Sequence, residues 1–250
     1  MFRRVTIWLE RKCGRNRDVF STTVGFSHGD FVEKTYHRYF QFLEWFEALL
    51  HSDIPLAVDS GNLLVDAESN SSASLVCRLP LILRQDKIHS ITNLEEDLAN
   101  PGHYALILIQ AGRASIAVAL EDKIIYSKQI QKYMVRATQG KSQLSYLNQK
   151  GKSRLGSRIR LRQSAEFFAE IDAKLKLLNQ EYDLKQLFLS CSPKLKGFWY
   201  QASSTKVFDK KDPRWRRIPF MVRPPGQVEM FRIHKLLCRS TLIYSNLLPI

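Results

Sequence analysis

The chain has 250 residues, of which 44% are hydrophobic and 25% are charged, and it carries a formal net charge of +14. These totals predict one large globular domain, or one domain with an extension, and they exclude a wholly disordered chain. Four widely spaced cysteines without a CxxC pair, no secretory-signal pattern and no run of about 20 apolar residues favour a soluble, cytoplasmic protein over a disulfide-bonded or membrane-spanning one.

The sequence of the first region, residues 1–99, predicts an α/β arrangement of unclear role. Apolar residues recur at spacings of three and four over residues 30–50, which predicts an amphipathic helix with Asp30 and Glu33 at its start. Its aromatic stripe is more typical of core packing than of a ligand platform. Short strands are expected at residues 63–65 and 75–83, where Pro80 indicates an edge or a bend.

The second region, residues 100–250, begins with the turn signal Asn100-Pro101-Gly102. Three β-rich runs with short separators then predict an antiparallel meander, and a fourth run follows it. These runs cover residues 104–109, 114–120, 123–127 and 133–137.

The remaining elements of this region mix helices with strands. Leu161, Ala165, Phe168, Ile171, Leu175 and Leu178 recur at helical spacing and predict a long amphipathic helix. We further expect a buried strand at 184–191, a short helix at 193–202, an edge strand at 215–222 because of Pro219, and a closing helix at 227–238. The sequence thus predicts an α/β fold with a mixed β-sheet and flanking helices.

Positive charge is concentrated in one part of the chain. Residues 1–122 hold 12 Lys and Arg against 16 Asp and Glu, whereas residues 123–162 hold 11 Lys and Arg and no acid. The rest holds 15 Lys and Arg against 8 Asp and Glu. This asymmetry favours a polyanionic partner, nucleic acid above all, because clustered cations release counterions from phosphates. The alternatives are a solvated basic face or adhesion to acidic lipid.

Residues 132–162 contain three glycines, Gly140, Gly151 and Gly156, among many Lys and Arg residues. Residues 138–152 have few apolar side chains to pack, which predicts an exposed, mobile loop. Glycine lets the backbone approach a ligand closely, and flanking cations can hold phosphates. The candidate RNA-binding cations are Arg136, Lys150, Lys152, Arg154, Arg158, Arg160 and Arg162. Composition alone also allows a flexible basic loop without a catalytic role.

Two strings in the second region carry a family resemblance. YMVRATQGKSQ with the basic stretch after it, and the later DPRWRRIPFMVRPPGQVEMFRIHKLL, resemble the Vms-type release-factor-like domain. That domain is related to the catalytic domain of eukaryotic and archaeal peptide-chain release factors. The resemblance covers roughly residues 100–240. A Gly-x-x-Gln pattern alone occurs often by chance. Together with Arg217-Ile218-Pro219-Phe220 and the Arg-Pro-Pro motif Arg223-Pro224-Pro225 before a last helix, it becomes fairly specific.

The resemblance implies a release-factor catalytic-domain-like fold and an activity. A loop containing Gly140, Lys141, Ser142 and Gln143 would enter the peptidyl-transferase centre and cleave peptidyl-tRNA on stalled large ribosomal subunits, in ribosome quality control. Ester hydrolysis and a tRNA cut near the terminal CCA both remain open, and Lys141 stands where relatives often have a small residue. The implied partners are the large subunit and tRNA, the protein acting as a monomer without cofactor or metal. The rival functions are a non-catalytic ribosome- or tRNA-binding module and a free-standing endoribonuclease.

Other candidate chemistry has weaker support. His234 and Cys238 have ligand spacing on an expected helix, but a coincidental pair on a packed face explains them better than a metal site. Cys191 could be a nucleophile, although a buried structural thiol is the commoner situation. Trp199, Tyr200 and Trp215 lie near cations and could stack on bases, with core packing the better interpretation for at least two.

Overall fold

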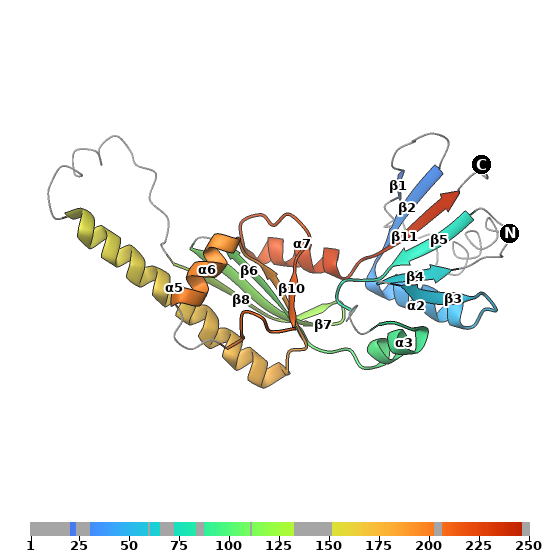
Figure 1. Cartoon of the computed structure of the whole chain (residues 1–250), viewed down its shortest axis with the longest axis horizontal. Coiled ribbons are helices and arrows are strands. Elements are labelled where there is room, and N and C mark those ends of the chain that lie inside the picture. The colour runs from blue at the N-terminus through green and yellow to red at the C-terminus, as the bar shows by residue number, and fades with distance from the viewer. Residues whose placement is uncertain are drawn as a thin grey trace. The chain divides into compact units, whose positions relative to one another are not determined.

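The computed structural model describes residues 21–23, 31–59, 61–65, 73–83, 88–110, 112–132, 152–202 and 207–246. Of residues 21–23, 31–33, 73–74, 152–163 and 244–246 it describes the backbone alone. The chain splits into two compact units, Met1–Pro101 with Lys235–Ile250 and Gly102–His234. Each unit is built around its own sheet (Figure 1).

The first unit contains a six-stranded sheet in which every described pairing is antiparallel. Its strands, in spatial order, are β1 (Ser21–Thr23), β2 (Phe31–His37), β11 (Ser240–Asn246), β5 (Ala73–Arg78), β4 (Asn62–Val65) and β3 (Leu56–Asp59). Two helices accompany it, α2 (Tyr39–Leu50) and α3 (Ile91–Ala99). The helix α2 buries Phe42, Trp45, Phe46 and Leu49, which recur at the spacing of one helical face.

The helix predicted over residues 30–50 is wrong in its first third. Residues 31–37 form β2, and the helix starts only at Tyr39, where the backbone N–H of Arg38 donates to Gln41 Oε1 at 2.9 Å. Asp30 therefore does not cap it. The reason is a partner distant in sequence: β2 pairs along its whole length with β11, so that His37 lies opposite Ser240. A local periodicity cannot report a strand partner from the other end of the chain.

The second unit contains a five-stranded mixed sheet. Its strands, in spatial order, are β10 (Trp215–Arg217), β9 (Gln186–Ser190), β6 (Tyr104–Gln110), β7 (Arg113–Leu120) and β8 (Lys123–Gln131). The pairs β6–β7 and β7–β8 are antiparallel, which confirms the predicted meander, and β9 runs parallel to both β6 and β10. The fold class is thus α/β with a mixed sheet and flanking helices, as the sequence predicts.

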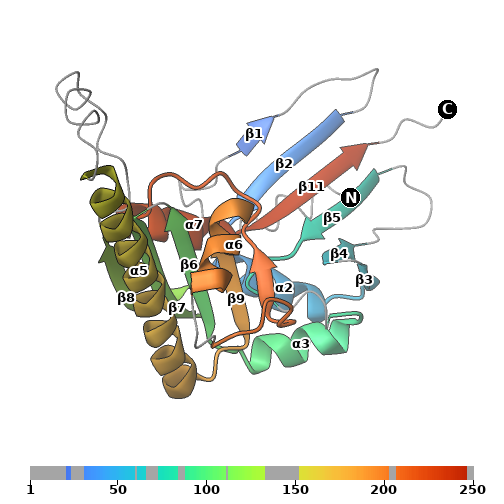
Figure 2. The ribbon, with the colours of Figure 1, turned by 60° about the vertical axis from the view of Figure 1, so that its left-hand side comes forward.

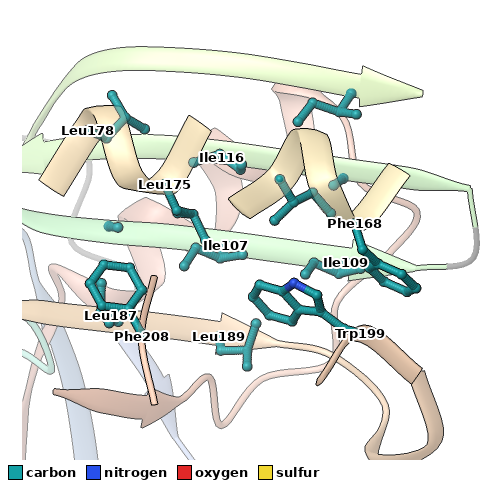
Figure 3. Packing of buried hydrophobic residues seen from close by; sticks show 14 of the residues in the cluster. Ile107, Ile109, Ile116, Phe168, Leu175, Leu178, Leu187, Leu189, Trp199 and Phe208 are labelled. Carbon is teal, nitrogen blue, oxygen red and sulfur yellow. The ribbon is translucent and has the colours of Figure 1, made fainter. Parts of the chain in front are cut away.

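Helices cover both faces of this sheet. The helix α5 (Lys152–Tyr182) buries Phe168, Ile171 and Leu175 in one cluster with Ile107 and Ile109 of β6 (Figure 3). The helix α6 (Pro193–Ala202) adds Trp199 to the same cluster. Figure 2 shows α5 in front of the sheet and α7 (Gln227–Leu237) behind it. Because strand side chains alternate between faces, β6 is buried along nearly its whole length.

Several other predicted elements are found close to their expected bounds. The strand β9, the helix α6 and the helix α7 match the predictions at 184–191, 193–202 and 227–238. The strand β10 is an edge strand, as Pro219 indicates, and it ends at Arg217. The fourth run, residues 133–137, lies outside the described residues. The division into 1–99 and 100–250 stays a prediction, and β11 lies in the first unit's sheet.

Candidate nucleic-acid interface

The predicted reactive residues Gly140, Lys141, Ser142 and Gln143 lie outside the described residues, as do Arg136 and Lys150. The other predicted RNA-binding cations belong to the amino-terminal part of α5, whose backbone alone is described. They are Lys152, Arg154, Arg158, Arg160 and Arg162. What the structure defines is therefore the framework on either side of the Gly140–Gln143 segment.

This segment follows β8, whose carboxyl end lies at the same end of the sheet as that of β6. Gln110 at the end of β6 pairs with Arg113, and Arg113 pairs with Gln131 at the end of β8. Because β9 is parallel to β6, its last residue Ser190 lies near the same edge, opposite Leu108. The carboxyl ends of three strands thus meet there. Open α/β sheets most often bind ligands just beyond the carboxyl ends of their strands.

The end of β8 is tied to the adjoining hairpin and to α5. The backbone N–H of Lys132 donates to the carbonyl oxygen of Gly112 at 3.0 Å, and Lys132 Nζ lies 3.3 Å from Glu170 Oε2. Gly112 has a φ of 78°, a conformation that favours glycine in the short β6–β7 connection. Lys132, the residue after β8, is therefore held in a fixed position.

The helix α5 continues beyond the part that packs on the sheet. Its cluster residues begin at Phe167, whereas the helix begins at Lys152, and Figure 1 shows this first part extending past the strands. Arg154, Arg158 and Arg162 are spaced four apart, so their Cα positions follow one side of the helix. Residues 123–162 hold no acid, and arginine is a residue type that suits contacts to RNA phosphates.

The Arg-Pro-Pro motif belongs to a chain segment held against the end of β6. The side-chain amide of Gln110 donates to the carbonyl oxygens of Val222 and Arg223, both at 3.3 Å. Buried Glu229, in the first turn of α7, accepts the backbone N–H of Arg223 at 2.8 Å. Arg232 donates to Glu229 at 2.6 and 2.8 Å, and it holds the pKa of that carboxyl below its usual range. The motif is therefore part of the framework.

Among the three candidate stacking aromatics, two serve the core. Trp199 is 4% exposed and donates its indole N–H to Asp172 at 3.0 Å. Trp215 packs edge-to-face against Trp199 with 6.2 Å between ring centroids, and its indole N–H donates to the Asp209 carbonyl oxygen. Tyr200 is partly exposed, and Lys196 Nζ lies 5.9 Å from its ring centroid. The core interpretation is thus confirmed for Trp199 and Trp215.

The weaker chemical candidates have structural roles. His234 is buried and hydrogen-bonded to the Tyr104 hydroxyl, and no group of three or more potential metal ligands occurs among the residues that the structure describes. Burial raises the pKa of the Cys191 thiol to about 11, so that the thiol stays protonated near neutral pH. A protonated thiol is a poor nucleophile, which favours the structural interpretation of Cys191.

A pocket of about 400 Å³ opens at the carboxyl ends of the strands, between the ends of β6 and β9 and the start of α6. It is lined by Ile109, Gln110, Ser190, Ser192, Lys194, Leu195 and Phe198. Sequence reasoning missed it, because its residues come from three separate elements. The sequence gives only a weak indication of this pocket: Lys194 and the exposed Phe198 lie four residues apart on the short helix α6.

A comparison with protein-family models agrees with the resemblance of the second region. A family model described as "Bacteroidetes VLRF1 release factor" matches residues 104–245, more than half of the chain. A solved structure titled "Vms1 mitochondrial localization core" is similar at 15% identity and a TM-score of 0.43, covering 84% of this chain and 83% of that one. A comparison with curated proteins gave no match. No helix in the described part of the chain is long and apolar enough to cross a membrane. By the family match, the chain belongs to the Bacteroidetes VLRF1 release factor family.

Proposed function

We propose that this protein cleaves peptidyl-tRNA on stalled large ribosomal subunits in the cytoplasm, with Gln143 at the reacting bond. The observation that carries the proposal is the position of the Gly140–Gln143 segment within a release-factor family match. It follows β8 at the carboxyl edge of a mixed sheet and precedes a helix rich in arginine. The partners would be the large subunit and peptidyl-tRNA, and no cofactor or metal is needed.

Glutamine suits this chemistry because its amide stays neutral at every working pH. Its amide can orient a water molecule or a ribose hydroxyl without titrating, and backbone N–H groups beside a glycine can stabilise an oxyanion. A held nucleophile also gains from proximity, which can supply several powers of ten in rate. The sequence predicts an exposed loop for this segment, and such a loop would not preorganise these groups alone, so the ribosomal surroundings would complete the site. This makes the reaction dependent on the ribosome.

Two bonds of peptidyl-tRNA are candidates for cleavage: the ester bond to the peptide and a phosphodiester bond near CCA. In ester hydrolysis, water adds across the ester and gives a peptide carboxylate and a tRNA with free 3′-terminal hydroxyls. In a tRNA cut near CCA, a ribose 2′-hydroxyl attacks the adjacent phosphorus and expels the 5′-oxygen of the next nucleotide. The products then carry a 2′,3′-cyclic phosphate and a 5′-hydroxyl. Lys141 or Arg136 could neutralise the phosphate in the second reaction.

The test uses labelled peptidyl-tRNA on isolated stalled large subunits, with the products resolved on a gel. We expect activity from the wild type, none from Gln143→Ala and full activity from Gln149→Ala, a matched glutamine in the same segment. Free peptide with intact tRNA would identify ester hydrolysis, whereas peptide bearing a short CCA remnant would identify tRNA cleavage.

The same experiment distinguishes the rival functions. Binding to the subunit without cleavage under either readout would contradict the proposal and favour a docking module. Equal cleavage of free tRNA without subunits would instead favour a free-standing endoribonuclease. Full activity of Gln143→Ala would remove this residue from the mechanism.

A further inference from the structure

We infer that the pocket at the carboxyl ends of β6 and β9 binds one nucleotide of single-stranded RNA, with the base stacked on Phe198 and a phosphate held by Lys194. None of the residues that line the pocket belongs to the Gly140–Gln143 segment. The inference concerns RNA binding alone, so it does not rest on the proposed cleavage.

The stacking surface is the ring of Phe198. Its side chain is 51% exposed, although it lies on a helix whose neighbouring residue Trp199 is 4% exposed. A phenylalanine left half-exposed at the wall of a pocket leaves part of its ring open to a ligand. A nucleobase has a flat π-face of matching size, and such faces stack on aromatic side chains with little dependence on base identity.

The phosphate ligand is Lys194. It lies four residues before Phe198, one turn earlier on α6, so that both side chains reach the same side of the helix. Its ammonium group has no ion pair among the described residues, and no acidic side chain lines the pocket. A cation beside an open aromatic ring, without an acid to neutralise it, matches the charge of a nucleotide better than that of an apolar peptide.

The remaining polar groups suit a base edge or a ribose. Gln110 donates its amide N–H groups to two carbonyl oxygens, which assigns its nitrogen and oxygen and leaves the amide oxygen as an acceptor. Ser190 and Ser192 contribute hydroxyls at the pocket wall, and Ser192 is fixed because its Oγ accepts the backbone N–H of Leu195 at 3.3 Å. The volume of about 400 Å³ is within the range of small-molecule sites, about 300–1,000 Å³.

The surroundings identify RNA as the occupant. The pocket opens at the edge where β8 ends, and β8 leads directly into the acid-free segment up to residue 162. The first turns of α5, which carry Arg154 and Arg158, extend past the strands (Figure 1), so an RNA strand bound there would have its next nucleotides near these strand ends.

The experiment measures binding of a fluorescein-labelled, unstructured RNA octamer to the full chain by fluorescence anisotropy, over a series of salt concentrations. We expect Phe198→Ala to weaken binding about 5- to 150-fold at every salt concentration, the effect of one lost base stack. Phe198→Trp should restore wild-type affinity or exceed it. Lys194→Gln should lower the slope of log K against log salt by about 0.7, the contribution of one phosphate on a single strand.

Two matched variants are the controls. Phe231→Ala removes an aromatic of similar exposure (43%) on α7, and Lys176→Gln removes an exposed cation of α5 that does not line the pocket. A photo-crosslink from 4-thiouridine in the octamer should map to the peptide containing Phe198. Wild-type affinity for Phe198→Ala, or equal losses for Phe198→Ala and Phe231→Ala, would overturn the inference. Because Gln143→Ala should still bind the octamer, failure of the proposed cleavage is distinguishable from failure of this site.

Discussion

Tyr104 Oη lies 2.9 Å from His234 Nε2, although the two residues are 130 positions apart in the chain. The Tyr104 hydroxyl donates to the carbonyl oxygen of Glu121 at 2.5 Å, so it must accept the hydrogen bond from His234. His234 therefore carries a proton on Nε2. Burial lowers the pKa of its imidazole from 6.5 to about 4, while nearby Asp122 acts in the opposite direction.

This pair predicts that the second unit loses stability in mild acid. The folded-state pKa lies below the unfolded value, so the unfolded chain takes up the proton first as pH falls below about 6.5. We expect a loss of about 2 kcal/mol between pH 7 and pH 5 from this residue alone. Urea unfolding followed by tryptophan fluorescence at both pH values measures it.

The control for the histidine effect is His51, an exposed histidine of the first unit. His234→Gln keeps a donor for the Tyr104 hydroxyl and should flatten the pH dependence, whereas His51→Gln should leave it intact. An unchanged pH dependence in His234→Gln would contradict this account.

Glu229 should be a main determinant of the Arg-Pro-Pro segment's order. Replacing it with glutamine removes the charge that accepts hydrogen bonds from Arg232 and from the Arg223 backbone. We expect a loss of about 1.5–3 kcal/mol, the usual range for hydrogen bonds to a charged group, and faster chymotrypsin cleavage after Phe220. Glu95→Gln, at an exposed position, should change neither quantity. Equal stability of the two variants would show that the hydrogen bonds of Glu229 are dispensable for the order of this segment.

Cys191 should react slowly with alkylating reagents. Its thiol pKa of about 11 leaves little thiolate at neutral pH, so the rate of iodoacetamide labelling should keep rising up to that pH. Cys191→Ser should retain full cleavage activity, because the proposed chemistry uses Gln143. Rapid labelling at pH 7, or loss of cleavage in Cys191→Ser, would reopen the nucleophile hypothesis.

The arginine row of α5 should control the salt dependence of RNA binding. Replacing Arg154, Arg158 and Arg162 together by glutamine should lower the slope of log K against log salt by about 2, since each phosphate contact on a single strand contributes about 0.7. Anisotropy titrations with an RNA octamer measure this slope. The control removes the same charge from Lys123, Lys128 and Lys176. Equal slopes in the two variants would mean that net charge alone matters.

Elements formed by neighbouring segments were predictable from the sequence. The meander β6–β7–β8 and the helices α6 and α7 follow local rules: apolar periodicity, short turns and proline positions. The same local reading located the acid-free segment and the Gly140–Gln143 motif. It also identified the family on the residues that the family model matches.

Elements that depend on distant partners were not predictable. Residues 31–37 have a pattern compatible with a helix, and they became a strand because β11, from the other end of the chain, pairs with them. The sequence predicted core packing for at least two of Trp199, Tyr200 and Trp215, but which two was left open, because the packing of Trp215 depends on Trp199 of α6 and on Phe208. Periodicity describes one segment at a time, and it cannot rank two conformations whose energies differ by a contact made elsewhere.

The sequence by itself determined the charge distribution, the Gly140–Gln143 motif and most helices of the second unit, since these follow from residue type and spacing. Only the tertiary structure decided that the ends of β6, β8 and β9 share one edge, and that Lys194 and Phe198 line a pocket with Gln110 there. The physical reason is that a binding site joins side chains through sheet pairing and helix packing, and both are long-range interactions that no local pattern encodes.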